Sequence, residues 1–182
     1  MKLMKFKLLE TFRKIKPFSI TFKDELTVIV GENCSGKSSF FTLLTDPSHK
    51  KIIEIKHTPE ISYRFFDTEK QNPRIKNSMS DSKNIMFDIA TRFSSHGEAM
   101  LPILLGTKQF NNELILIDEP DAGISLKNQK KMLDAFKMAI NNDCQIIMST
   151  HSYFLIKNVQ SVFNMSTKKW QSSQSYLTEI ES

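Results

Sequence analysis

The stretch Leu26-Thr-Val-Ile-Val30, followed directly by Gly31-Glu-Asn-Cys-Ser-Gly-Lys37-Ser38, decides the fold. The first five residues predict a strand covered on both faces, because such strands read as nearly continuous apolar and β-branched runs. Gly31 ends this strand, and residues 37–44 predict a helix that stops at Asp46-Pro47. A strand, a glycine-rich turn and a helix in this order are typical of an α/β protein.

The C-terminal half repeats the alternation of strand and helix. Residues 113–118 and 145–149 have the same buried-strand character, a helix is predicted over 126–140, and a short helix is predicted after His151. Because strands separated by helices pair in parallel, the fold class is α/β, with a mostly parallel sheet flanked by helices.

The N-terminal residues predict a different arrangement. Residues 3–9 and 17–23 alternate apolar and polar side chains, so we expect an antiparallel β extension. Two short strands are predicted over 51–56 and 61–66. Nothing in the sequence marks a linker, and we treat 1–182 as a single domain.

The middle of the chain is polar before it becomes helical. Residues 68–83 predict a loop, and Ile85, Met86, Ile89 and Phe93 lie on one face of a predicted helix. A second helix is predicted over 98–105.

Composition excludes several classes of protein. The chain has 182 residues, 40% hydrophobic and 25% charged, as expected for a globular protein. It lacks the roughly 18 apolar residues in succession that a membrane helix needs, and we expect a soluble, cytoplasmic protein with Cys34 and Cys144 reduced. Residues 1–23 hold seven basic side chains against Glu10, which fits either a patch for a polyanion or a solvated strand face.

Residues 31–38 match the phosphate-loop pattern of glycine, four residues, Gly-Lys and then Ser or Thr. In this context backbone N–H groups cradle phosphates, Lys37 neutralises them and the Ser38 hydroxyl ligates Mg²⁺. The sequence therefore predicts a nucleotide and Mg²⁺ as ligands. The predicted nucleotide-binding residues of the loop are Gly31, Asn33, Cys34, Ser35, Gly36, Lys37, Ser38 and Ser39.

An acidic pair follows the predicted strand Leu114-Ile-Leu-Ile, as Asp118-Glu119-Pro120. At the carboxyl end of a parallel strand, Asp118 is placed to reach Mg²⁺ through water, and Glu119 is placed to polarise the attacking water. Glu119 is therefore the predicted general base.

Three motifs together resemble the ABC-type ATPases: Asp118-Glu119-Pro120, Asp121-Ala-Gly-Ile-Ser125, and Ile146-Ile-Met-Ser-Thr-His151-Ser152. The resemblance implies a P-loop fold with a reduced helical insert, an interface loop at residues 122–125 and a γ-phosphate sensor at His151. Two positions depart from the pattern, since Cys34 stands where the family often has glycine and Ser125 where it usually has aspartate.

The family also carries a signature loop, which Ser94-Ser95-His96-Gly97-Glu98 resembles in degenerate form. The resemblance implies that Ser95, Gly97 and Glu98 contact ATP held by a second subunit. The alternative is a junction between two helices, broken at Gly97. The family also has a glutamine that contacts Mg²⁺ and the attacking water. Gln71 is the candidate for this role in the present sequence, and the equal alternative is that Gln71 is an ordinary polar loop residue.

The opening residues 6–13 and 18–22 resemble the SMC, RecF and OLD-type branch of the family, yet the 57 residues between Lys37 and Ser95 leave no room for a coiled-coil arm. The leading hypothesis is an Mg²⁺-dependent ATPase that forms an ATP-sandwiched homodimer and works on DNA or through a nuclease, repair or defence partner. The alternatives are the energising subunit of a membrane transporter and a nucleotide-sensing module of low turnover. The polar segment 170–182 shows no pattern, and its docking stays open.

Overall fold

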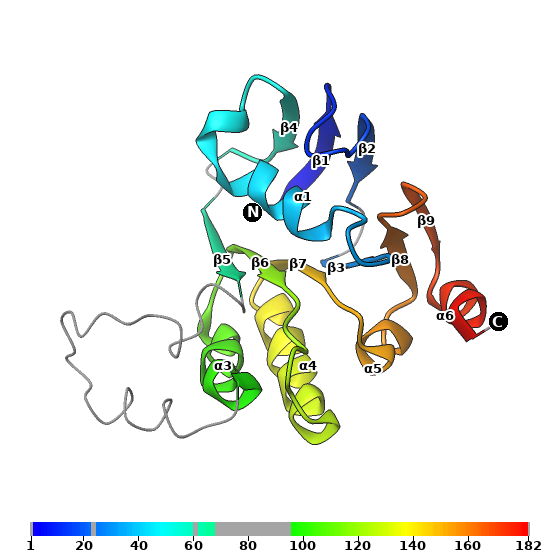
Figure 1. The fold of residues 1–182 in the computed structure, drawn as a ribbon. Coiled ribbons are helices and arrows are strands. Elements are labelled where there is room, and N and C mark those ends of the chain that lie inside the picture. The colour runs from blue at the N-terminus through cyan, green and yellow to red at the C-terminus, as the bar shows by residue number, and fades with distance from the viewer. Residues whose placement is uncertain (1, 23–24, 60–61, 68–95, 182) are drawn as a thin grey trace.

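The computed structural model describes residues 2–22, 25–59, 62–67 and 96–181, with the backbone alone for 96–100. Within these ranges the larger sheet has six strands in the order β5-β6-β7-β3-β8-β9 (Figure 1). All neighbouring pairs from β5 to β8 are parallel, and only β9 runs antiparallel, which confirms the predicted mostly parallel sheet. The strands are β3 (Leu26–Val30), β5 (Tyr63–Asp67), β6 (Leu114–Asp118), β7 (Gln145–Ser149), β8 (Ser161–Asn164) and β9 (Lys169–Ser172).

A smaller antiparallel sheet covers one side of this sheet. It consists of β1 (Leu3–Leu8) between β2 (Phe18–Thr21) and β4 (Ile53–His57), in the order β2-β1-β4. The predicted N-terminal β extension is therefore present, and it includes the strand expected at 51–56. The strand expected at 61–66 instead joins the parallel sheet as β5.

The helices lie in two layers. In Figure 1, α3, α4 and α5 lie below the larger sheet, while α1 lies above it with the small sheet. The predicted helix that carries Ile85 and Phe93 lies outside the described residues. The described helices are α1 (Lys37–Thr45), α3 (His96–Leu105), α4 (Leu126–Asn141), α5 (Tyr153–Lys157) and α6 (Ser173–Glu181), with short 3₁₀ turns η1 (Pro47–His49) and η2 (Gly106–Gln109).

Strand β3 separates two hydrophobic cores. Val28 and Val30 pack with Phe136 of α4 on one face, and Ile29 packs with Phe40 of α1 on the other. Because successive side chains of a strand point to opposite faces, both faces need apolar residues, which explains the continuous run in the sequence. Residues 27–30 of the strand are buried, and the strand ends at the carboxyl edge of the sheet, where Gly31 begins the phosphate loop.

The segment from Trp170 onward is structured, although no pattern in the sequence predicted it. Trp170 meets Phe163 of β8 edge-on, with ring centroids 5.6 Å apart. Tyr176 and Leu177 of α6 belong to the core under the larger sheet. Three apolar side chains in an otherwise polar stretch are too few to produce a recognisable hydrophobic periodicity. For this reason the sequence alone did not predict how the segment docks.

A buried glutamine joins the two sheets. The Gln145 side chain accepts a hydrogen bond from the Leu3 N–H at 2.7 Å and donates one to the Leu3 carbonyl at 3.0 Å. Gln145 is 2% exposed, and so is Leu3. We expect Gln145→Leu to lower the free energy of unfolding by about 2–4 kcal/mol, because two buried backbone groups lose their partners. Urea denaturation measures this change.

The matched control is Gln174→Leu, since Gln174 is exposed on α6. It should leave the unfolding midpoint nearly unchanged. An equal midpoint for Gln145→Leu and Gln174→Leu would show that the paired hydrogen bonds contribute nothing.

Candidate active site

The loop between β3 and α1 adopts a conformation that requires glycine at two positions. Gly31 has φ 137° and Gly36 has φ 103°, both in the region that L-residues avoid. A Cβ on Gly36 would lie 2.5 Å from the Ile15 side chain, so the packing also excludes a larger residue. Gly36 precedes the first turn of α1, whose free N–H groups favour anions.

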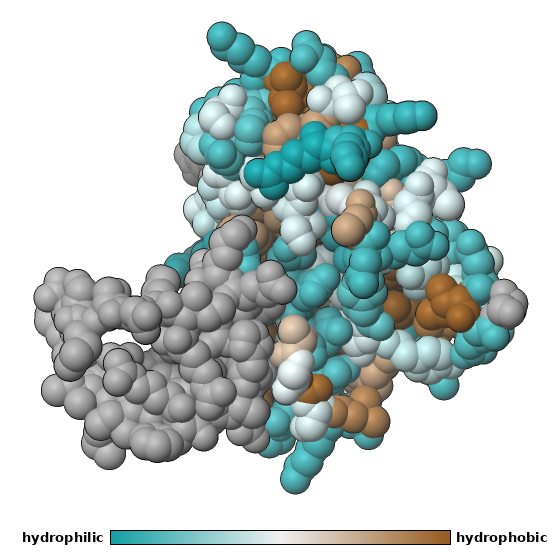
Figure 2. Space-filling model, viewed as in Figure 1, coloured by the Kyte–Doolittle hydropathy of each residue, from teal (hydrophilic) through white to brown (hydrophobic). Residues whose placement is uncertain are grey.

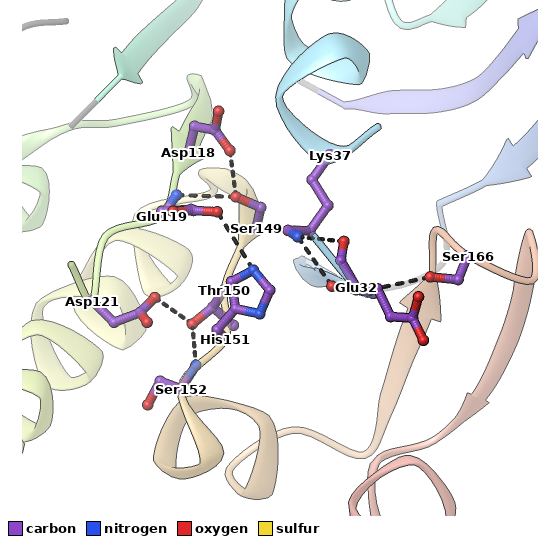
Figure 3. A network of polar contacts seen from close by, with 11 residues as sticks. Glu32, Lys37, Asp118, Glu119, Asp121, Ser149, Thr150, His151, Ser152 and Ser166 are labelled. Atoms are coloured by element: carbon purple, nitrogen blue, oxygen red, sulfur yellow. Dashed lines mark hydrogen bonds and ion pairs between the residues drawn. The ribbon is translucent and has the colours of Figure 1, made fainter. Parts of the chain in front are cut away.

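Lys37 places a buried cation inside this loop. Its Nζ donates hydrogen bonds to the carbonyls of Gly31 at 3.0 Å and Glu32 at 3.1 Å, and the residue is 5% exposed (Figure 3). Burial lowers the pKa of Lys37, while the nearby Glu119 and Asp118 raise it. The ammonium is thus held between the loop backbone and the acidic pair.

Ser149 joins Asp118 and Glu119 at the carboxyl ends of β6 and β7. Its hydroxyl donates to Asp118 Oδ1 at 2.5 Å and accepts from the Glu119 N–H at 3.0 Å (Figure 3). Sequence reasoning missed Ser149. The available signal was its place two residues before His151, on the strand that neighbours the acidic pair.

Asp118 is a buried acid with a second acid beside it. Burial is the main cause that raises its pKa, Asp67 raises it further, and hydrogen bonding from Ser149 and Ser38 lowers it. Asp67 ends β5, pairs in register with Asp118 and is 7% exposed. It is a second residue that the sequence reasoning did not identify. Carboxylate and hydroxyl oxygens gathered in this way are ligands that Mg²⁺ prefers.

Glu119 faces His151 across the mouth of the site. Its Oε1 lies 3.6 Å from His151 Nε2, an ion pair when the imidazole is protonated (Figure 3). Glu119 has φ 52°, an unusual conformation for a residue with a side chain. Burial and then Asp118 raise the pKa of the Glu119 carboxyl, and His151 and Lys37 lower it.

A chain of hydrogen bonds ties the loop after the acidic pair to the segment that holds His151. The Thr150 hydroxyl donates to Asp121 and accepts from the Ser152 N–H at 2.9 Å. The Ser152 hydroxyl donates to Gln129 at 2.6 Å, and Gln129 donates to the Ile124 carbonyl at 3.0 Å. These side chains therefore link the two segments directly.

The remaining predicted residues divide into three groups. Asn33, Cys34, Ser35, Ser38 and Ser39 line one cavity of about 770 Å³ together with Lys37 and Glu119. Ser125 lies at the N-cap of α4 without a side-chain capping bond. Gln71 and Ser95 lie outside the described residues, and for Gly97 and Glu98 the structure gives only their place in the first turn of α3.

The rest of the cavity lining was not predicted from the sequence as part of the site, apart from Gly36. It consists of Arg13, Lys14, Ile15, Lys16, Glu32, Gly36, Met165, Ser166 and Lys168.

A phosphate loop after one parallel strand and an acidic pair after another define a P-loop ATPase, and comparisons with known proteins agree. A model described as an AAA ATPase domain matches residues 1–109, and one described as an AAA domain, putative AbiEii toxin, type IV TA system, matches residues 62–157. Each match spans more than half of the chain, which therefore belongs to the AAA ATPase domain family and binds and hydrolyses ATP.

Solved structures are similar over almost the whole chain. One is cbiO1 from Clostridium perfringens, part of the ABC transporter complex cbiONQ, with 15% identity and a TM-score of 0.62 over 99% of this chain and 93% of that one. Another is a putative metal-chelate type ABC transporter, with 16% identity and a TM-score of 0.59 over 97% and 86%. At this identity they support the fold alone.

No curated protein matches the chain. Among the described helices, none combines the length and the apolar character needed to cross a membrane.

Proposed function

We propose that ATP is hydrolysed in the cavity at the phosphate loop, with Glu119 as the general base and Lys37 as the ligand of the phosphates. The observation that carries this proposal is the meeting of Lys37 with Asp118 and Glu119. Lys37 comes from the start of α1, the two acids come from the end of β6, and the three side chains interact electrostatically. The raised pKa of the Glu119 carboxyl suits a base, because a stronger base accepts the proton of water more readily.

The donor set also fits Mg²⁺. Asp118 and Asp67 bring two carboxylates together, and Ser38 adds a hydroxyl at the start of α1. Among the described residues no group of three or more acidic, His or Cys side chains is arranged to hold a metal ion unaided. Mg²⁺ takes one or two protein oxygens and fills its other positions with water and substrate phosphates. When bound, Mg²⁺ supplies charge neutralisation at the β- and γ-phosphates.

We assign His151 the role of γ-phosphate sensor. It lies against the proposed base, at 3.6 Å, and follows Thr150 in the hydrogen-bond chain that reaches Asp121 and Ile124. A change at the γ-phosphate would therefore be felt in the loop 121–125. That loop is the part of the chain that we propose contacts a second copy in an ATP-sandwiched homodimer.

We propose DNA, or a nuclease, repair or defence protein, as the partner of this dimer. The support is the basic β1–β2 region, where Lys5 and Lys16 are exposed and Arg13 and Lys14 stand in a turn at positive φ. On the face seen in Figure 2, hydrophilic residues predominate over the small sheet, and apolar residues form only small separate spots. The toxin–antitoxin description of one matching family supports a defence setting.

A second candidate is the energising subunit of a membrane transporter. Two similar structures are from ABC transporters, and an apolar groove of about 310 Å³ beside β4 and β5 offers a surface for a membrane subunit. The groove residues are Leu3, Leu44, Ile53, Ile55, Tyr63, Leu114 and Leu116, with Lys50 and His57 at its edge.

Retention on DNA or on membranes separates the two candidates. We expect the ATP-bound protein to bind duplex DNA in a mobility-shift assay, and to lose about tenfold or more in affinity between 50 and 200 mM salt, because phosphate contacts release counterions. Lys5→Glu with Lys7→Glu should weaken this binding strongly, because both lysines are exposed on β1 and neither lines the nucleotide cavity. The matched control, Lys137→Glu with Lys157→Glu, changes the net charge equally but lies on the helical side.

Binding to liposomes or to a membrane fraction, with DNA affinity equal in both double variants, would favour the transporter candidate.

A further inference from the structure

The turn between β8 and β9 packs against the phosphate loop and is held in a fixed shape. The Ser166 hydroxyl accepts a hydrogen bond from the Glu32 N–H at 3.1 Å (Figure 3). The Asn164 side chain accepts from the N–H groups of Ser166 at 2.9 Å and Thr167 at 3.4 Å. Asn164 is 4% exposed, so the turn is anchored from inside the protein.

Lys168 ends this turn and points its amine into the cavity of the phosphate loop. Its Nζ donates to the Ser35 carbonyl at 3.4 Å and lies 4.8 Å from the centroid of the Phe18 ring. Its backbone has φ 59°, which costs a residue with a side chain about 1 kcal/mol. The chain therefore maintains an unfavourable local conformation at the residue that carries this ammonium to the loop.

Lys168 has no acidic partner in the part of the chain that the structure describes. Among the described residues no carboxylate forms an ion pair with it, and burial lowers its pKa to about 8. Because Lys168 is half-buried, its unpaired ammonium loses part of its hydration, and an anion placed in the cavity would offset that loss. The other titratable groups that line the same cavity are Arg13, Lys14, Lys16, Lys37, Glu32, Cys34 and Glu119.

We propose that Lys168 is a nucleotide-binding residue that contacts the phosphate chain of ATP from the β8–β9 turn. This inference rests on the proposed function, in which the same cavity binds ATP. It adds a second lysine to the site, far from Lys37 in the sequence and supplied by the turn between β8 and β9.

The test compares Lys168→Met with Lys169→Met. Lys169 is the next residue along the chain, is exposed, and does not line the cavity. Binding is measured with a fluorescent ATP analogue, and tripolyphosphate is used as the competitor because it carries phosphates without a base or ribose. We expect Lys168→Met to lower the affinity for both ligands by about tenfold, which is the effect of losing one charge-assisted contact. Lys169→Met should leave both affinities unchanged.

Measurements against pH add a readout that loss of packing would not change. Since ATP favours the protonated lysine, wild-type affinity should fall as pH rises above about 8, and Lys168→Arg should reduce that fall because arginine stays charged. Wild type and Lys168→Arg both retain Lys37, so the difference between their pH profiles reports on residue 168 alone.

Two results would overturn the inference. One is equal affinity of wild type and Lys168→Met for tripolyphosphate. The other is a loss of thermal stability in ligand-free Lys168→Met, with affinity and pH profile unchanged, which would make Lys168 a structural contact to Ser35 and Phe18. If wild type itself fails to bind ATP, the proposed function fails as well. If Lys37→Met abolishes binding and Lys168→Met does not weaken it, only this inference fails.

Discussion

We expect Glu119→Gln to lower ATP turnover by about 10²- to 10⁴-fold, while ATP still binds. The reason is that an amide of the same shape accepts no proton from water. Glu119 follows the buried Asp118 at the carboxyl end of β6, and its Oε1 lies 3.6 Å from Nε2 of His151, which follows β7. Phosphate release under saturating Mg²⁺ and ATP measures the loss.

The same hydrolysis assay can be repeated as a function of pH. The pKa of the Glu119 carboxyl is raised, chiefly by burial, and only the deprotonated carboxylate acts as a base. Hydrolysis should therefore fall as the pH is lowered through this raised pKa. Glu54→Gln is the matched control, because Glu54 is an exposed acid on β4. Turnover of Glu119→Gln within about threefold of wild type would rule out Glu119 as the base.

The second large effect is expected from Lys37→Met. We expect ATP affinity to fall at least about 100-fold, because truncating one partner of a buried charged contact costs several kcal/mol. Lys37 is 5% exposed, and the loop carbonyls hold its ammonium in place. Removing it also removes a cation that lowers the pKa values of Asp118 and Glu119. Titration calorimetry with ATP measures the affinity.

Lys137→Met is the control for this experiment, since Lys137 is exposed on α4 and pairs only with Asp134 among the described residues. Its ATP affinity should equal that of wild type. If Lys37→Met binds ATP with unchanged affinity, the phosphate loop is not the site of binding.

Much of the fold could be predicted from local pattern. The runs Leu26–Val30, Leu114–Asp118 and Gln145–Ser149 are fully or nearly fully buried, and continuous apolar runs identified all three as central strands. The strands β8 and β9 were not predicted because each has only four residues and β9 is largely polar. Their place depends on pairing with β3 and with each other, which no local period encodes.

The site also contains residues that a local motif identified and residues that only the pairing of strands brings together. Lys37, Asp118 and Glu119 belong to contiguous motifs, so their spacing alone identified them. Asp67 and Ser149 act through strand register, because Asp67 lies beside Asp118 only when β5 pairs with β6. Lys168 reaches Ser35 from 133 residues away, a proximity that follows from the order β3-β8-β9 in the sheet. Contacts of this kind cannot be read from one sequence.

The mass of Glu119→Gln in solution tests most directly the proposal that ATP joins two copies of the chain. Light scattering after gel filtration compares the variant in Mg²⁺-ATP and in Mg²⁺-ADP, with Lys37→Met as the variant that should not respond to either nucleotide. The expected result is twice the mass of one chain with ATP and the mass of one chain with ADP. The mass of a single chain at saturating ATP, with binding confirmed by calorimetry, would contradict the ATP-sandwiched homodimer.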